Sequence, residues 1–73
     1  MSKTIQWLSP APITCEMCGS LIRNVFYDAK TKQGPWACMC PRCHTEGQGV
    51  GKLGRGYGQE YTKQGTAWIK TGG

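Results

Sequence analysis

Residues 15–19, Cys15-Glu16-Met17-Cys18-Gly19, and residues 40–43, Cys40-Pro41-Arg42-Cys43, form two C-x2-C pairs separated by twenty-one residues. Two residues between cysteines allow one tight turn to present both sulfurs to the same ion. Two such turns complete a tetrahedron with zinc–sulfur distances of about 2.3 Å. We therefore predict one zinc ion, bound by Cys15, Cys18, Cys40 and Cys43. Because the protein fills all four positions, we expect this zinc to be structural rather than catalytic.

Two neighbouring residues are alternative ligands. Cys38 would replace Cys40 in a C-x4-C pair, and His44 would replace Cys43. We favour the two equal pairs because they repeat one turn geometry, whereas Cys38 lies two residues before Cys40 on an expected strand. Gly19 also fits the first turn, since glycine readily adopts a left-handed conformation there.

The size and composition of the chain favour a metal over disulfides as the stabilising link. The core of a 73-residue domain supplies only about 3 to 5 kcal/mol, so a further link is needed. The five cysteines are odd in number, and no apolar run of the secretory kind follows the N-terminus. We expect a soluble monomer in the cytoplasm, without membrane association.

The chain divides into three parts. Residues 1–14 form an extended N-terminal arm, because Ser9-Pro10-Ala11-Pro12 cannot continue a helix. Residues 15–46 form the zinc ribbon, in which residues 28–34 are a polar hairpin loop. The first strand candidate of the ribbon contains Leu21, Ile22, Val25, Phe26 and Tyr27. Residues 47–73 form a Gly-rich basic segment and a weak terminal hairpin.

These parts together predict the fold class. We expect a small metal-stapled β-rich domain, a zinc ribbon with two C-x2-C knuckles, little helix and a flexible Gly-rich C-terminal segment. Six of the twelve residues from Gly47 to Gly58 are glycine, a density that disfavours a helix or a central strand.

The net charge of +5 favours an anionic partner, such as nucleic acid or an acidic protein surface. In the arm, the candidates for docking on a partner protein are Ile5, Trp7 and Leu8. Trp7 and Ile13 have the alternative of packing on the small core. In the hairpin loop, Lys30 and Lys32 are candidates to face acidic protein or nascent RNA, or they only solvate the loop.

No enzyme motif in the sequence is complete. Residues 49–54, GVGKLG, match G-x-G-x-x-G, but only nineteen residues follow them, too few for a βαβ unit. Glu46 and Leu53 occupy positions where a phosphate-binding loop needs glycine and a hydroxyl. Cys38 and His44 lack a third group that would orient them as a nucleophile pair. We therefore expect no enzymatic activity.

The segments GPWACMCPRCH (34–44) and GVGKLGRGYGQEY (49–61) resemble a family of short zinc-ribbon proteins of tailed bacteriophages. Members carry C-x2-C-G, a GPWA-x-M-C-P-x-C-H segment and a G-x-G-Q-x-Y tail, so the match covers roughly residues 15 to 61. The position of Cys38 varies in that family, which implies the other four cysteines as ligands. The chain departs from the pattern around Lys52-Leu53 and in its longer tail.

The length, basicity and zinc ribbon also resemble small phage transcription regulators that bind host RNA polymerase. This resemblance implies binding at the N-terminal region of the largest polymerase subunit near the RNA exit channel, with the flap of the second subunit nearby. It further implies inhibition of sigma-dependent initiation and antitermination at intrinsic terminators, in the host bacterial cytoplasm.

Two other functions compete with this one. The first is direct nucleic-acid binding, in which Lys52, Arg55 and Tyr57 act as a flexible phosphate clamp with one stacking ring. The second is a structural or adaptor role in the phage with another host target.

Overall fold

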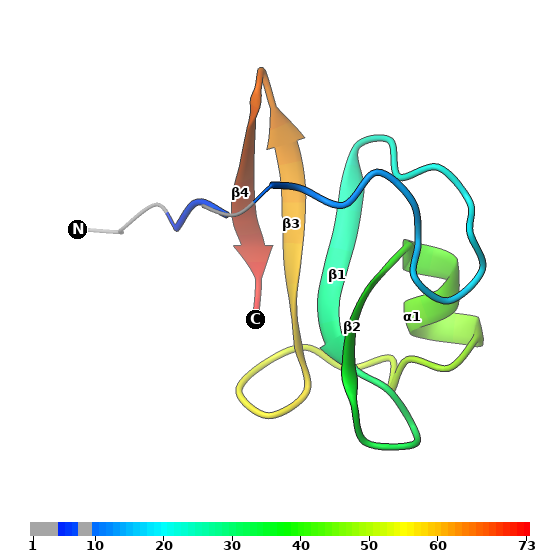
Figure 1. Ribbon diagram of the computed structural model, residues 1–73. Helices are drawn as coiled ribbons and strands as arrows, with labels where there is room; N and C mark the ends of the chain where they lie inside the picture. The colour runs from blue at the N-terminus through cyan, green and yellow to red at the C-terminus, as the bar shows by residue number, and fades with distance from the viewer. Residues whose placement is uncertain (1–4, 8–9) are drawn as a thin grey trace.

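The structure is a computed structural model that describes residues 5–7 and 10–73. Within these residues the chain forms β1 (Val25–Lys30), β2 (Trp36–Met39), α1 (Pro41–Glu46), β3 (Gly58–Gln64) and β4 (Ala67–Gly72). The strands form one antiparallel sheet in the order β2-β1-β3-β4 (Figure 1). The expected β-rich class with little helix is therefore confirmed. No helix in this part of the chain has the length and apolar composition needed to cross a membrane.

The first strand begins later than the sequence pattern suggests. Leu21 and Ile22 lie before β1, in a short hairpin whose other arm contains Ile13. The Ile22 N–H donates to the Ile13 carbonyl oxygen at 2.9 Å. The apolar pattern is similar in the hairpin and in β1, so it does not reveal which residues pair with the sheet.

The hairpin loop expected over residues 28–34 is shorter than predicted. β1 continues to Lys30 because it pairs with β2 on one side and with β3 on the other, which gives its backbone groups partners in the sheet. The turn follows at Thr31, whose N–H and hydroxyl both donate to the Pro35 carbonyl oxygen, at 2.9 and 2.7 Å.

The terminal hairpin is longer and more central than the weak element expected. β3 has seven residues and pairs along β1 from Val25↔Thr62 to Ala29↔Gly58. β4 then pairs with β3 and widens the sheet. The sheet therefore joins the metal-binding region to the C-terminal region, although about thirty residues separate β1 from β3 along the sequence.

An aromatic cluster covers one face of the sheet. Phe26 is fully buried, and its ring centroid lies 5.3 Å from Trp7, 5.2 Å from Tyr61 and 5.0 Å from Trp68. Trp7 also meets Tyr61 edge to face at 5.2 Å. Such aromatic pairs contribute about 0.5 to 1.5 kcal/mol beyond the area that they bury. The cluster is the main apolar contact on this face.

The N-terminal arm pairs with β4, the last strand of the sheet. The Trp7 N–H donates to the Trp68 carbonyl oxygen at 2.9 Å, and the Lys70 N–H donates to Ile5 at 2.7 Å. Residues 10–14 run toward the helix side of the molecule (Figure 1). Trp7 therefore packs, half-buried, on the domain itself, as its second predicted role requires. Ile13, for which packing was the alternative, is 75% exposed.

The Gly-rich segment 47–57 lies outside the strands and the helix, but Gly49 within it and Gly58 directly after it pack closely. A Cβ at Gly49 would lie 2.5 Å from the His44 Cα, and a Cβ at Gly58 would lie 2.6 Å from the Ala29 Cβ. Both glycines are buried, and their surroundings leave no room for a side chain. Close packing, and not only freedom of the backbone, explains glycine at these positions.

We predict that Trp7→Ala lowers the free energy of unfolding of the metal-loaded protein by about 2 kcal/mol, because the substitution opens the aromatic cluster. Chemical denaturation at a fixed free metal concentration measures this change. Trp36→Ala is the matched control, since Trp36 is 47% exposed and its loss should cost less than about 0.5 kcal/mol. Equal losses in the two variants would show that Trp7 does not belong to the core.

Candidate metal centre

The structure brings the four predicted ligand cysteines together. The Sγ atoms of Cys15, Cys18, Cys40 and Cys43 all lie within 4.8 Å of one another. A tetrahedral zinc–thiolate site places its sulfurs about 3.8 Å apart, given zinc–sulfur distances of about 2.3 Å. The distance between the Cys18 and Cys40 sulfurs is 3.8 Å. The cluster therefore has the size of a single metal site.

The first pair of cysteines lies at the tip of the short hairpin formed by residues 13–15 and 20–22. The Cys15 N–H donates to the Ser20 carbonyl oxygen at 2.8 Å, and the Gly19 N–H donates to the Cys15 carbonyl oxygen at 2.9 Å. Gly19 has φ 78°, so the left-handed turn expected there is confirmed. The hairpin thus holds both sulfurs on one side of a tight turn.

The second pair of cysteines lies on the first turn of α1. Cys40 immediately precedes the helix, Pro41 is its first residue, and the His44 N–H donates to the Cys40 carbonyl oxygen at 3.0 Å. Proline suits this position because its φ is already helical. It also lacks an N–H, and an N–H here would have no acceptor within the helix. Residues three apart on a helix lie on the same face, so Cys40 and Cys43 point to the same site.

Glu16 connects the first knuckle to the sheet. Its N–H donates to the Cys38 carbonyl oxygen at 3.0 Å, and its Oε1 accepts the Cys38 N–H at 2.6 Å. Cys15 is 2% exposed and packs with Ala29 and Met39 in the core on this face. The knuckle is therefore tied to the sheet both by hydrogen bonds and by packing.

Before a metal binds, the pKa values of the thiols are shifted in opposite directions. Burial opposes ionisation of Cys15, but N–H groups of Cys40, Cys18 and Met17 point to its sulfur and bring its pKa below the ordinary value. Hydrogen bonds from Ser20 lower the pKa of Cys18 to about 6. Burial and the neighbouring sulfurs raise the pKa of Cys43. A metal cation would displace the remaining protons, because only thiolates coordinate it.

The two alternative ligands lie outside the four-sulfur group. Cys38 is half-buried on β2, where burial and the carboxylates of Asp28 and Glu16 raise its pKa to about 11. The His44 ring is buried, stacks on Tyr27 at 4.3 Å and places its Nε2 3.0 Å from the Lys52 carbonyl oxygen. His44 therefore links α1 to the Gly-rich segment.

The predicted partner-binding residues in the arm have different surroundings. Trp7 is half-buried in the aromatic cluster, Ile5 is 49% exposed, and Leu8 lies outside the described residues. The hairpin lysines, Lys30 and Lys32, are both exposed. Of the residues that the structure describes, Ile5 and Trp7 lie along β4, whereas Lys30 and Lys32 lie at the turn between β1 and β2.

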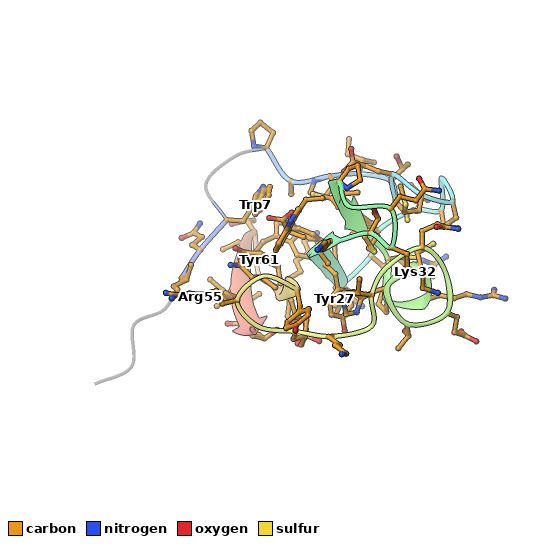
Figure 2. All side chains as sticks on the ribbon, turned by 90° about the horizontal axis from the view of Figure 1, so that it is seen from below. Trp7, Tyr27, Lys32, Arg55 and Tyr61 are labelled. Atoms are coloured by element: carbon orange, nitrogen blue, oxygen red, sulfur yellow. The ribbon has the colours of Figure 1, made fainter. Side chains whose placement is uncertain are left out.

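The predicted nucleic-acid contacts do lie together. Lys52, Arg55 and Tyr57 are all exposed in the Gly-rich segment, and the Lys52 Nζ lies 5.4 Å from the centre of the Tyr57 ring. Seen from below, Arg55 and Lys32 mark the two sides of this end of the molecule (Figure 2). The Gly-rich segment and the β1–β2 turn thus occupy the same end of the sheet (Figure 1).

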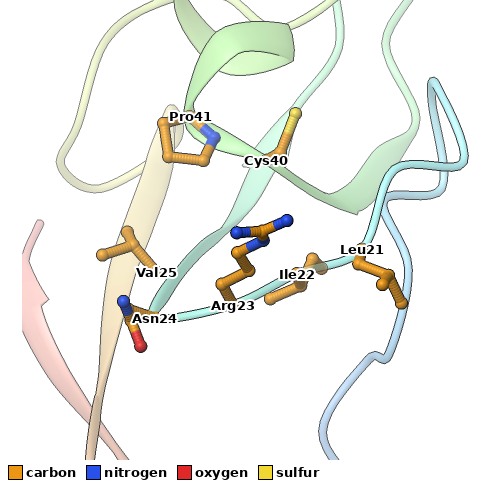
Figure 3. Close-up of a pocket in the computed structure, with 7 residues that line it drawn as sticks. All are labelled: Leu21, Ile22, Arg23, Asn24, Val25, Cys40 and Pro41. Carbon is orange, nitrogen blue, oxygen red and sulfur yellow. The ribbon is translucent and has the colours of Figure 1, made fainter.

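Sequence reasoning missed a set of exposed apolar residues around the first knuckle. Ile13 is 75% exposed, Leu21 is 64% exposed and Met17 is 39% exposed. Leu21 also lines a hollow of about 290 Å³ that lies between residues 21–25 and the Cys40-Pro41 pair (Figure 3). Residue type alone predicts that such residues are buried. Their exposure follows from the pairing of the short hairpin, which the sequence pattern does not reveal.

We predict that Cys18→Ser and Cys40→Ser each abolish tight metal binding and cooperative folding, because each removes one thiolate of the tetrahedron. The spectrum of bound Co²⁺, which reports tetrahedral thiolate coordination, measures the first effect, and thermal melting measures the second. Cys38→Ser is the matched control and should retain both properties. Loss of the Co²⁺ spectrum in Cys38→Ser, with retention in Cys40→Ser, would assign Cys38 as a ligand.

No family model, curated protein or solved structure matches this chain. The assignment of the metal centre therefore rests on two observations within the chain. The C-x2-C spacing repeats, and the fold brings the four sulfurs to metal-binding separations. These observations identify a candidate site for one metal ion.

Proposed function

We propose that this protein is a zinc-stapled, non-enzymatic phage protein that regulates transcription by binding host RNA polymerase. Zinc is the ion that best suits the site, because four thiolates in a tetrahedron are typical of structural zinc and of iron–sulfur sites. The repeated C-x2-C spacing favours zinc between these two. Four protein ligands leave no open position for a substrate, which supports a structural role for the ion.

The observation that carries a protein-binding function is the exposure of apolar side chains around the first knuckle. Ile13 and Leu21 lie on the two arms of the same hairpin, and Met17 lies at its tip. A contiguous apolar patch on a protein surface is typical of an interface, and we take these three exposed side chains as its candidates. The metal fixes this hairpin, so the surface is rigid before a partner arrives and little conformational entropy is lost on binding.

The resemblance to phage regulators supplies the identity of the partner. It supports a site at the N-terminal region of the largest polymerase subunit, near the RNA exit channel and the flap of the second subunit. A protein bound there would affect both initiation with sigma and the release of RNA at intrinsic terminators. On this proposal the protein inhibits the first step and promotes read-through at the second.

We predict that the double variant Ile13→Ser, Leu21→Ser binds purified RNA polymerase at least about tenfold more weakly, because it removes two apolar anchors from the interface. The matched control is the double variant Ile5→Ser, Leu53→Ser. It replaces the same two residue types at positions 49% and 39% exposed, and it should bind as the wild type does. Zinc content and melting temperature should be unchanged in both, since exposed substitutions have small effects on stability.

Recovery of the polymerase from nuclease-treated lysate on the tagged wild-type protein is the first readout, followed by terminator read-through with purified components. Retention of no polymerase would contradict the proposal. Retention of another host protein in its place would favour the adaptor function. Loss of polymerase binding in the Ile5→Ser, Leu53→Ser variant alone would assign docking to the arm or the Gly-rich segment.

A further inference from the structure

Two loops that are distant in sequence form one surface, here called the basic end. It contains the exposed side chains of the β1–β2 turn region and the Gly-rich segment, namely Lys30, Lys32, Trp36, Lys52, Arg55 and Tyr57. Backbone hydrogen bonds join the two loops. The Lys32 N–H donates to the Gln48 carbonyl oxygen at 2.7 Å, and the Lys30 N–H donates to the Tyr57 carbonyl oxygen at 2.9 Å.

The basic end concentrates positive charge without acidic neighbours in its own segments. Four of the nine Lys and Arg residues lie in residues 29–37 and 47–58, which contain no Asp or Glu. Three of the four acidic residues of the chain have polar partners. Glu16 accepts the Cys38 N–H, Glu60 accepts the hydroxyls of Tyr27 and Thr71, and Glu46 lies 3.9 Å from Arg42. The fourth, Asp28, is half-buried in β1, two residues before Lys30.

Exposed aromatic residues neighbour the cations at this end of the sheet. Trp36 is the register partner of Lys30 across β1 and β2, and directly opposed residues lie on the same face of a sheet. On the other side of Lys30, its N–H bonds to Tyr57, whose ring lies 5.4 Å from the Lys52 Nζ. Trp36 is 47% exposed and Tyr57 is 46% exposed. The two exposed rings therefore belong to residues whose backbones lie on either side of Lys30 in the sheet.

We infer that the basic end binds single-stranded RNA. Cations hold the phosphates of a single strand, and exposed aromatic rings stack with its bases, which a duplex keeps stacked on one another. Both kinds of group are exposed here and come from hydrogen-bonded segments. The inference deepens the proposed function and rests on it only for the source of the RNA, which would be the transcript emerging from the polymerase. An acidic protein surface would be attracted by the cations but would not require the exposed rings of Trp36 and Tyr57.

The binding should depend strongly on salt. If the four cations each neutralise one phosphate, the logarithm of the affinity should fall with the logarithm of salt concentration with a slope of about −3. The two aromatic rings add a contribution that salt does not screen. These two contributions can be separated by substitution.

The test is fluorescence anisotropy of a labelled, unstructured oligouridine with the zinc-loaded full chain. Lys32→Glu with Arg55→Glu should reduce the slope to about −1.4, because two of four phosphate contacts are lost. Tyr57→Ala should weaken binding by about fivefold or more with little change in slope. A double-stranded oligonucleotide of equal length should bind more weakly than the single strand.

The matched control is Arg23→Glu with Lys63→Glu, which changes the net charge equally. Arg23 is exposed just before β1, and Lys63 is exposed near the end of β3, so both lie at the opposite end of the sheet from the basic end. This variant should bind oligouridine within about twofold of the wild type, because salt screens distant charges. An equal loss in the control variant would overturn the inference, since it would show attraction to net charge alone.

The outcomes separate this inference from the proposed function. Oligouridine binding that depends on Tyr57 supports the RNA site, whether or not the polymerase is retained. No binding of oligouridine, with polymerase binding lost in the Lys32→Glu, Arg55→Glu variant, would overturn the RNA site and assign the basic end to an acidic protein surface. Equal affinity for inorganic polyphosphate and oligouridine would also overturn it, because polyphosphate has no bases to stack.

Discussion

Four cysteine thiols from two separate parts of the chain meet at one site. One pair comes from a hairpin tip before β1 and the other from the first turn of α1 after β2, so a bound ion closes the chain around the first two strands. Four thiols this close together have few favourable arrangements without a cation, because their ionised forms repel one another. Metal binding of about 10 to 16 kcal/mol in small zinc domains is as large as the whole stability of a domain.

The metal core and the aromatic cluster occupy the two faces of one sheet. Tyr27 and Ala29 face the metal side, where His44 and Cys15 cover them, whereas Phe26 faces the cluster with Trp7. Successive residues of a strand point to opposite faces, so β1 contributes to both cores. This arrangement leaves residues of the hairpin tip and of the basic end exposed, and these are the two surfaces for which we propose partners.

The local parts of this structure could be predicted from the sequence, and the long-range parts could not. The ligands follow from a spacing of two residues, and the turn at Gly19 follows from the intrinsic preference of glycine. The central place of β3 depends on pairing with β1, which no local pattern encodes. For the same reason, the outward position of Ile13 and the meeting of Lys30 with Tyr57 became visible only in the fold.

We expect metal binding and folding to be one event. Titration of Zn²⁺ into the metal-free chain, followed by the dispersion of its amide resonances, measures whether the two coincide. Without metal, we expect the narrow amide dispersion of an unfolded chain. The change to a fully dispersed spectrum should be complete at one equivalent of Zn²⁺ per chain. A dispersed spectrum in the presence of excess chelator would show the opposite, because the sheet would then fold without the metal.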